Sequence, residues 1–269
     1  MNKYQNITLW LIAIVITVSS AVYQKTTGPT YPIKGEVQIN DTTISYKLLR
    51  SHNTGIDARI IIPVDNETIT GTYDFRRFRS NDDWTTRAME QNGGSLVATL
   101  PHQPPAGKIM YRLYLIDAGG IRHELHREPI LIRFKGAVPA YVLIPHIFFM
   151  FFAMLISNRS GLQALARGEN LYKYALWTAG LLLAGGLILG PIVQKFAFGA
   201  FWTGWPWGHD LTDNKTIVAF LAWGLAIWKN RGNRHNPGWV LAASIILFLI
   251  YMIPHSVLGS ELDFTIMEQ

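Results

Sequence analysis

Long apolar runs occupy much of the chain outside residues 25–136. One run covers residues 7–23, and four more cover residues 138–157, 171–193, 217–228 and 239–258. Most of them approach the ~20 residues that an α-helix needs to cross a bilayer. The run at 217–228 reaches this length only if residues 211–216 begin the same helix. The pattern therefore predicts an integral membrane α-helical bundle with five transmembrane helices.

Residues 25–136 follow a different pattern. Short runs rich in β-branched and aromatic residues are separated by turn signals such as Asn40-Asp41 and Asn92-Gly93-Gly94. Seven or more short strands at this spacing are typical of an antiparallel sandwich. In this pattern the segment resembles an immunoglobulin or fibronectin type III module. We therefore expect an all-β sandwich domain inserted between the first and second membrane helices.

Basic residues near the helix ends predict the orientation of the chain. The connectors at 158–173 and 229–235 are short and basic, with Arg159, Arg167 and Lys173 in the first. Such connectors stay in the cytoplasm. The N-terminus is then cytoplasmic, while the β-sandwich and the C-terminus are extracytoplasmic (periplasmic in a Gram-negative bacterium). The predicted parts are an N-terminal anchor at 1–24, which would also suit a cleaved signal, the β-sandwich at 25–136 and a four-helix membrane domain at 137–269.

The composition limits the classes of cofactor, partner and activity. The chain has no cysteine, which excludes disulfides, thiolate metal sites and covalent c-type haem attachment. Its formal charge of +6 does not indicate nucleic acid as a partner, because the basic residues form no aromatic-interleaved stripe in the polar segment. We find no nucleophile–base pair, phosphate loop or carboxylate dyad. Hydrolytic and transferase activities therefore have no support, and a redox role is the enzymatic role left open.

The external loop at 194–216 is crowded with aromatic residues and glycines. Trp202, Trp205 and Trp207 lie close together, and His209 and Asp210 follow directly. Tryptophan collects where the apolar core of a membrane meets the headgroups, so one interpretation is an interfacial belt. The interleaved glycines and the His-Asp pair favour a second interpretation, in which a tight loop lays its rings against a flat ligand.

Two histidines follow Ile-Pro pairs in the outer half of the membrane segments. The helical rise puts His146 ~18 Å and His255 ~24 Å above the cytoplasmic ends of their helices, and helix tilt absorbs a mismatch of ~6 Å. Ionisable groups inside a membrane indicate function. We therefore predict His146 and His255 as metal ligands, with His209 as an alternate. Either ring could instead bond a backbone carbonyl that its proline frees.

Part of this loop resembles a known motif. The residues Phe198-Gly199-Ala200-Phe201-Trp202, then Trp205 or Trp207, then Asp210 resemble the tryptophan-rich WWD segment of the haem-handling membrane proteins of cytochrome c maturation. The interval between Trp202 and Asp210 is wider than in that family. The resemblance implies that Trp202, Trp205 and Trp207 form a platform for haem b, bound without covalent attachment. The depth argument then makes His146 and His255 its candidate axial ligands.

A cofactor without porphyrin is the alternative. A single metal ion could be held by the three histidines together with carboxylates from Asp210, Asp213, Glu261 or Asp263. For Asp213 and Glu261, an ion pair with Lys195 or Lys215 is the simpler interpretation.

Together these features predict a haem- or redox-metal-binding membrane protein that acts at the outer face of the membrane, in haem handling or electron transfer. The competing interpretation is a non-enzymatic accessory or assembly subunit of a larger membrane complex. Expected partners are membrane lipid and a protein that docks on the β-sandwich. The basic cluster Arg76-Arg77-Phe78-Arg79 is interpreted as a solvated strand end, with docking to an acidic partner as the alternative.

Overall fold

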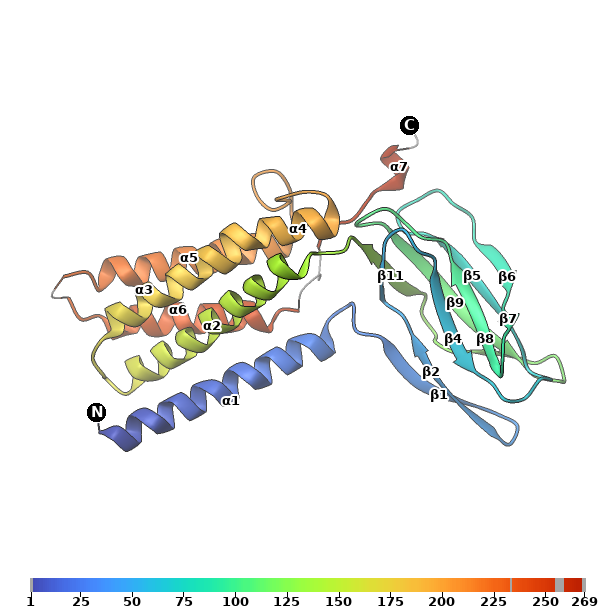
Figure 1. The fold of residues 1–269 in the computed structure, drawn as a ribbon, viewed down its shortest axis with the longest axis horizontal. Coiled ribbons are helices and arrows are strands. Elements are labelled where there is room, and N and C mark those ends of the chain that lie inside the picture. The colour runs from blue at the N-terminus through green and yellow to red at the C-terminus, as the bar shows by residue number, and fades with distance from the viewer. Residues whose placement is uncertain (1, 233, 255–258, 268–269) are drawn as a thin grey trace. The chain divides into compact units, whose positions relative to one another are not determined.

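The computed structural model describes residues 2–232, 234–254 and 259–267. The chain divides into two compact units. The helical unit comprises Met1–Pro29, Val138–Phe196 and Ala200–Gly259, and the β unit comprises Thr30–Ala137, Ala197–Gly199 and Ser260–Gln269. The β unit therefore combines one long segment with two short segments from later in the chain. Figure 1 shows the helices and strands of both units.

The described strands of the β unit form three sheets (Figure 1). The largest has the order β3-β11-β9-β5-β6, with β10 paired to β9. A second has the order β4-β8-β7, and β1 pairs with β2. The bounds are β1 Ile33–Ile39, β2 Thr42–Leu48, β3 Ser51–Asn53, β4 Ala58–Pro63, β5 Thr70–Arg77, β6 Thr85–Ala88, β7 Glu90–Gln91, β8 Ser95–Leu100, β9 Lys108–Ile116, β10 Arg122–Glu124 and β11 Ile130–Lys135.

Alternating apolar residues build the core of the β unit. Successive side chains of a strand point to opposite faces, and in β4 the buried positions are Ala58, Ile60 and Ile62 while the residues between them are exposed. The same alternation runs along β9. The buried side chains of both strands join Phe134 of β11 in one hydrophobic cluster. Each large apolar side chain buried in this way contributes ~1.5–3 kcal/mol.

The prediction of a separate β domain is confirmed, and its sheets are compatible with a sandwich. The prediction of wholly antiparallel pairing is wrong at one place. β3 and β11 pair in parallel, with Ser51 opposite Arg133, whereas the other described pairs are antiparallel. This parallel pair joins segments far apart in sequence, and short-range alternation carries no information about such a pairing.

Three segments among the described residues are long and apolar enough to cross a membrane. They are α1, α2 and the continuous run Leu171–Phe198, which comprises α3, η1 and α4. The helix α6 is apolar but shorter, with 16 residues. The predicted five transmembrane helices are therefore borne out only for these three segments. The bounds are α1 Lys3–Thr27, α2 Ala140–Leu165, α3 Leu171–Leu182, the π-helical η1 Leu183–Leu189, α4 Gly190–Phe198, α5 Leu211–Lys229, α6 Pro237–Met252 and α7 Phe264–Met267.

Small residues allow close packing within the helical unit. A Cβ atom on Gly161 of α2 would lie 2.4 Å from Ser244 Oγ of α6, so only glycine fits there. Ser244 Oγ in turn donates a hydrogen bond to the carbonyl of Ser157 at 2.8 Å. Trp223 of α5 is fully buried in a cluster with residues of α2, α3 and α6. These four helices therefore share one core.

Residues 260–267, which we call the tail, follow the helices and bind within the β unit. Glu261 forms ion pairs with Lys108 and, at 2.8 Å, with Arg79. The amide of Phe264 donates to the carbonyl of Arg79 at 2.9 Å. Burial lowers the pKa of Lys108, and its hydrogen bond to Glu261 opposes that shift. The tail thus supplies a carboxylate to a largely buried ammonium group.

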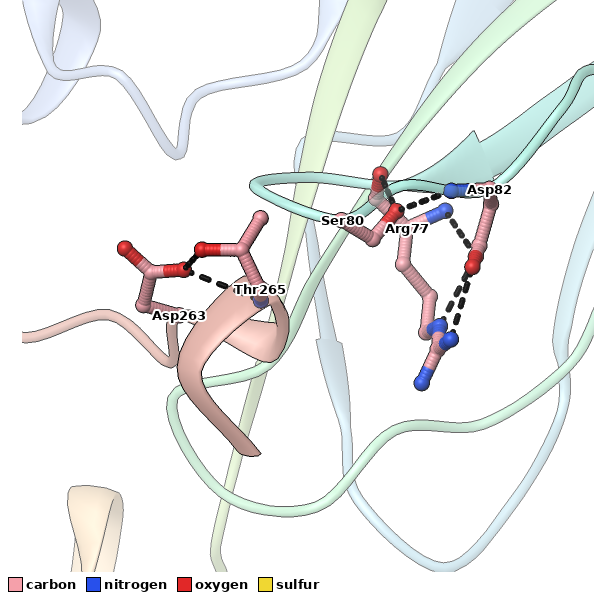
Figure 2. Close-up of polar contacts among 5 residues, drawn as sticks. All are labelled: Arg77, Ser80, Asp82, Asp263 and Thr265. Carbon is pink, nitrogen blue, oxygen red and sulfur yellow. Dashed lines mark hydrogen bonds and ion pairs between the residues drawn. The ribbon is translucent and has the colours of Figure 1, made fainter. Parts of the chain in front are cut away.

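The turn beside the tail has its own ion pair. Arg77 donates to both carboxylate oxygens of Asp82, at 2.8 and 2.7 Å, and Ser80 Oγ donates to the carbonyl of Arg77 (Figure 2). The Arg77 guanidinium also lies 4.7 Å from the ring centre of Phe264. Figure 2 shows Asp263 accepting hydrogen bonds from Thr265 at the start of α7. The hydrogen bonds from Arg77 lower the pKa of Asp82.

Candidate functional site

The tryptophan loop, residues 200–210, is held by the first turn of α5. Asp213 Oδ2 accepts hydrogen bonds from the amides of Thr203 at 2.7 Å and Gly204 at 2.9 Å. Asn214 Oδ1 accepts from the amide of Trp205 at 2.6 Å. A Cβ on Gly204 would lie 2.5 Å from the Cβ of Asp213, so the close approach requires glycine. The loop is therefore held in place by hydrogen bonds from its backbone amides to side chains of α5.

Asp210 has a structural role in this loop. Its side chain caps α5 by accepting from the amide of Thr212 at 2.8 Å, which satisfies a helix-end donor. Its own amide donates to the carbonyl of Thr203 at 3.0 Å. The Asp210 side chain is buried. The predicted cofactor-binding residue therefore ends the loop and begins the helix.

The tryptophan rings differ in their surroundings. Trp202 Nε1 donates to the carbonyl of Trp205 at 3.1 Å, which closes the loop on itself. Trp205 and Trp207 are 71% and 80% exposed, and His209 is exposed as well. Exposed indole rings on a rigid loop match the expected geometry of an interfacial belt.

His146 is engaged by a neighbouring helix. It lies in α2 directly after Pro145, and its Nδ1 donates to the carbonyl of Gly185 at 2.9 Å. Gly185 belongs to η1, where the hydrogen bonds follow a π-helical pattern, and its carbonyl also accepts from the amide of Gly190. This contact corresponds to the structural interpretation of the histidine, although the carbonyl comes from a neighbouring helix and is not one freed by Pro145.

The prediction of haem b, or of a single metal ion, is wrong. Among the described residues, no group of three or more His, Cys, Asp or Glu side chains could hold a metal ion, and the chain has no cysteine. The second predicted ligand, His255, lies outside the described residues. The carboxylates of the alternative metal site have other partners: Thr212 for Asp210, the loop amides for Asp213, Lys108 and Arg79 for Glu261, and Thr265 for Asp263.

A second candidate site lies on the less buried face of the largest sheet. Arg76 of β5 and Arg112 and Tyr114 of β9 alternate with the core positions of their strands, whereas Trp84 precedes β6 and Arg122 begins β10. The Trp84 ring contacts two guanidinium groups, with its centre 5.1 Å from that of Arg76 and 5.2 Å from that of Arg112. The Arg122 guanidinium lies 3.5 Å from the ring centre of Tyr114. We call these five residues the arginine–aromatic face.

The charge of this face is unbalanced. Asp74 is the carboxylate that contacts it, through Arg122 at 3.6 Å, and Asp74 also accepts from Thr86 at 2.7 Å. In the described part of the chain, neither Arg76 nor Arg112 forms an ion pair. Three arginines therefore face two carboxylates, because the exposed Glu124 of β10 stands opposite Tyr114, and Asp74 is the one that forms an ion pair among the described residues.

Of the arginine–aromatic face, the sequence analysis singled out only Arg76. The cluster Arg76-Arg77-Phe78-Arg79 was noticed as a run of basic residues, but its members separate in the structure. Arg76 joins the arginine–aromatic face, whereas Arg77 binds Asp82 and Arg79 binds Glu261. The usable signal is the alternation within β9, where Arg112 and Tyr114 stand between buried residues.

Comparison with known proteins adds no further constraint. Neither a protein-family model nor a curated protein matches the chain. The resemblances to WWD proteins and to immunoglobulin-like modules therefore stay predictions, and the function has to be inferred from geometry.

Proposed function

We propose that this chain is a membrane-anchored accessory subunit whose β unit docks an acidic protein partner outside the cytoplasm. The observation that carries the proposal is the arginine–aromatic face. Tryptophan, tyrosine and arginine dominate the binding energy of protein interfaces. A surplus of arginine selects an acidic partner, because complementary charge sets specificity and speeds association.

The connectivity supports a five-span topology. Ala197–Gly199 and the tail both belong to the β unit, and the amide of Gly136 donates to the carbonyl of Ala197 at 2.9 Å. In the proposed topology the chain returns to the membrane face that carries the β unit after Leu171–Phe198 and again after α6. Each return requires an even number of crossings, as in α2 with Leu171–Phe198 and in α5 with α6.

Helix lengths and charges agree with this topology. The 19 residues of α5 and the 16 residues of α6 extend ~28 Å and ~24 Å, close to the ~30 Å hydrocarbon core. Arg167 follows α2, and Arg231 follows α5, so the connector after each of these helices carries a basic residue. Cytoplasmic loops carry this excess of positive charge. The β unit and the tryptophan loop are then extracytoplasmic, with the exposed indoles at the outer interface.

Single-cysteine labelling tests the topology cleanly, because the chain has no native cysteine. Glu128→Cys places a thiol on the exposed surface of the β unit, and Arg231→Cys places one in the connector after α5. A membrane-impermeant maleimide should label Glu128→Cys in intact cells and Arg231→Cys only after permeabilisation. Equal labelling of both variants in intact cells would contradict the five-span arrangement.

Co-purification tests the docking role. The tagged full-length chain is purified from its own membranes in mild detergent, and bound proteins are quantified by mass spectrometry. Arg112→Glu and Trp84→Ala should each reduce a bound acidic protein at least ~10-fold, as expected for loss of an interface hot spot. Raising the salt concentration should weaken the complex as well.

The matched control is Arg59→Glu, because Arg59 is an exposed arginine of β4 in a different sheet. It makes the same change of charge and should leave the complex intact. Loss of the partner in all three variants would indicate a nonspecific charge effect. No loss in Arg112→Glu would place the interface elsewhere and remove the basis of the proposal.

A further inference from the structure

A cavity of about 580 Å³ lies among α1, α2 and α3 of the helical unit. Aromatic side chains from all three helices line it, including Trp10 of α1, Phe152 of α2 and Trp177 of α3. Phe148 and Trp177 are 52% and 60% exposed, so the cavity opens beside side chains that would face lipid in a membrane. Its size is typical of small-molecule sites.

The cavity is polar at one end. Lys173 lies in the first turn of α3, and Leu181 lines the wall eight residues further along. At 1.5 Å per residue, these positions are ~12 Å apart along the helix. Within the described residues, Lys173 has no ion-pair partner. The cavity therefore has one cationic end and a long aromatic wall.

A second cation lies behind this wall. Arg159 of α2 is fully buried, and its guanidinium lies 5.5 Å from the ring centre of Trp10 and 5.4 Å from that of Tyr174, both of which line the cavity. Its hydrogen bonds go to neutral amides, to Gln163 at 2.6 Å and Asn6 at 2.7 Å.

The charge of Arg159 is thus left without compensation. In the part of the chain that the structure describes, its Nε is buried without a hydrogen-bond partner and no carboxylate pairs with it. Buried charges are normally paired. Two uncompensated cations beside one cavity favour an anionic ligand.

We propose that this cavity binds one anionic phospholipid of the surrounding bilayer. The phosphate lies at Lys173, within the field of Arg159, and an acyl chain fills the aromatic part. Basic pockets between transmembrane helices bind acidic lipid headgroups.

Native mass spectrometry of the delipidated full-length protein tests the site. The protein is titrated with phosphatidylglycerol, with phosphatidylcholine of the same acyl chains, and with glycerol 1-phosphate. We expect one phosphatidylglycerol to bind at least about five-fold more tightly than phosphatidylcholine, and Lys173→Gln to remove most of that preference, since one basic residue near the membrane surface contributes about that factor. Trp177→Ala should weaken both lipids, because it shortens the wall that holds the acyl chain.

Lys229→Gln is the matched control, because Lys229 ends α5 and does not line the cavity. It should leave both affinities unchanged. Equal binding of the two lipids to the wild type, or equal losses in Lys173→Gln and Lys229→Gln, would overturn the proposal. Glycerol 1-phosphate binding as tightly as phosphatidylglycerol would indicate a soluble ligand, and a dimer that Trp177→Ala dissociates but phosphatidylglycerol does not would indicate a second copy in the cavity. Either result would also overturn it.

Discussion

Glu261→Gln tests the contact that holds the tail on the β unit. The side chain of its partner Lys108 is 8% exposed, whereas that of Arg79 is 52% exposed. Exposed ion pairs contribute only ~0–1 kcal/mol, so most of the energy lies in the pair with Lys108. Hydrogen bonds to charged groups contribute ~1.5–3 kcal/mol. We therefore expect the variant to weaken tail binding by ~2 kcal/mol.

Amide hydrogen exchange of the full-length protein in detergent measures this loss directly. The amides of Leu262 and Phe264 donate to the carbonyls of Ala106 and Arg79, at 3.3 and 2.9 Å. They exchange when the tail opens, and a local opening is read as its own free energy. A loss of ~2 kcal/mol raises the open population about thirty-fold. Exchange at residues 262–264 should therefore accelerate by about that factor.

Two further variants make this prediction refutable. Glu90→Gln removes an exposed carboxylate from β7 and should leave the exchange of the tail unchanged. In Lys108→Met/Glu261→Gln, exchange should be slower than in Glu261→Gln alone, because the buried ammonium that lacked a partner has been removed. If Glu261→Gln accelerates exchange less than about threefold, or no more than Glu90→Gln does, the pair does not hold the tail.

Two predictions concern other parts of the fold. Gly161→Ala should destabilise the helical unit by ~1–3 kcal/mol through overpacking against Ser244. The control Gly224→Ala should be neutral or stabilising, because a Cβ there meets no atom within 4 Å. Thermal unfolding in detergent compares the two variants, and equal melting temperatures would contradict the close packing at Gly161. The pKa of Asp82 is lowered from its ordinary 3.8 by Arg77, so its contribution to stability is complete above that value and is lost as pH falls through the folded-state pKa. Asp82→Asn should flatten this acid-induced loss in a pH series of unfolding, and a loss as steep as that of the exposed control Asp83→Asn would exclude the mechanism.

The strands and most of the helices could be predicted from the sequence, because local patterns of apolar and capping residues determine them. The β-rich runs became strands because alternating residues such as Ile60 and Ile62 face one core. The short run at 217–228 became the longer α5 because Asp210 caps a helix that starts at Leu211. Asp210 itself was predicted to bind a cofactor, since a cap and a ligand use the same carboxylate chemistry.

Contacts between distant segments could not be read in this way. Arg159 was assigned to a cytoplasmic connector, but α2 continues to Leu165 and buries the guanidinium against Trp10 and Tyr174. The partner of His146 depends on η1, whose π-helical register is a property of backbone hydrogen bonds and not of side-chain periodicity. Both residues are buried polar groups, for which sequence alone does not distinguish a structural partner from a ligand.

The pairing of Lys108 with Glu261 has a consequence for biosynthesis. The two residues are 153 positions apart, and α2 through α6 are translated between them. During translation the β unit can fold early, but the Lys108 ammonium group lacks the Glu261 carboxylate until α2 through α6 have been synthesised. Newly made chains that stall within the helices should therefore expose a loosened edge of the β unit to quality-control proteases, which would recognise unfinished copies by that edge.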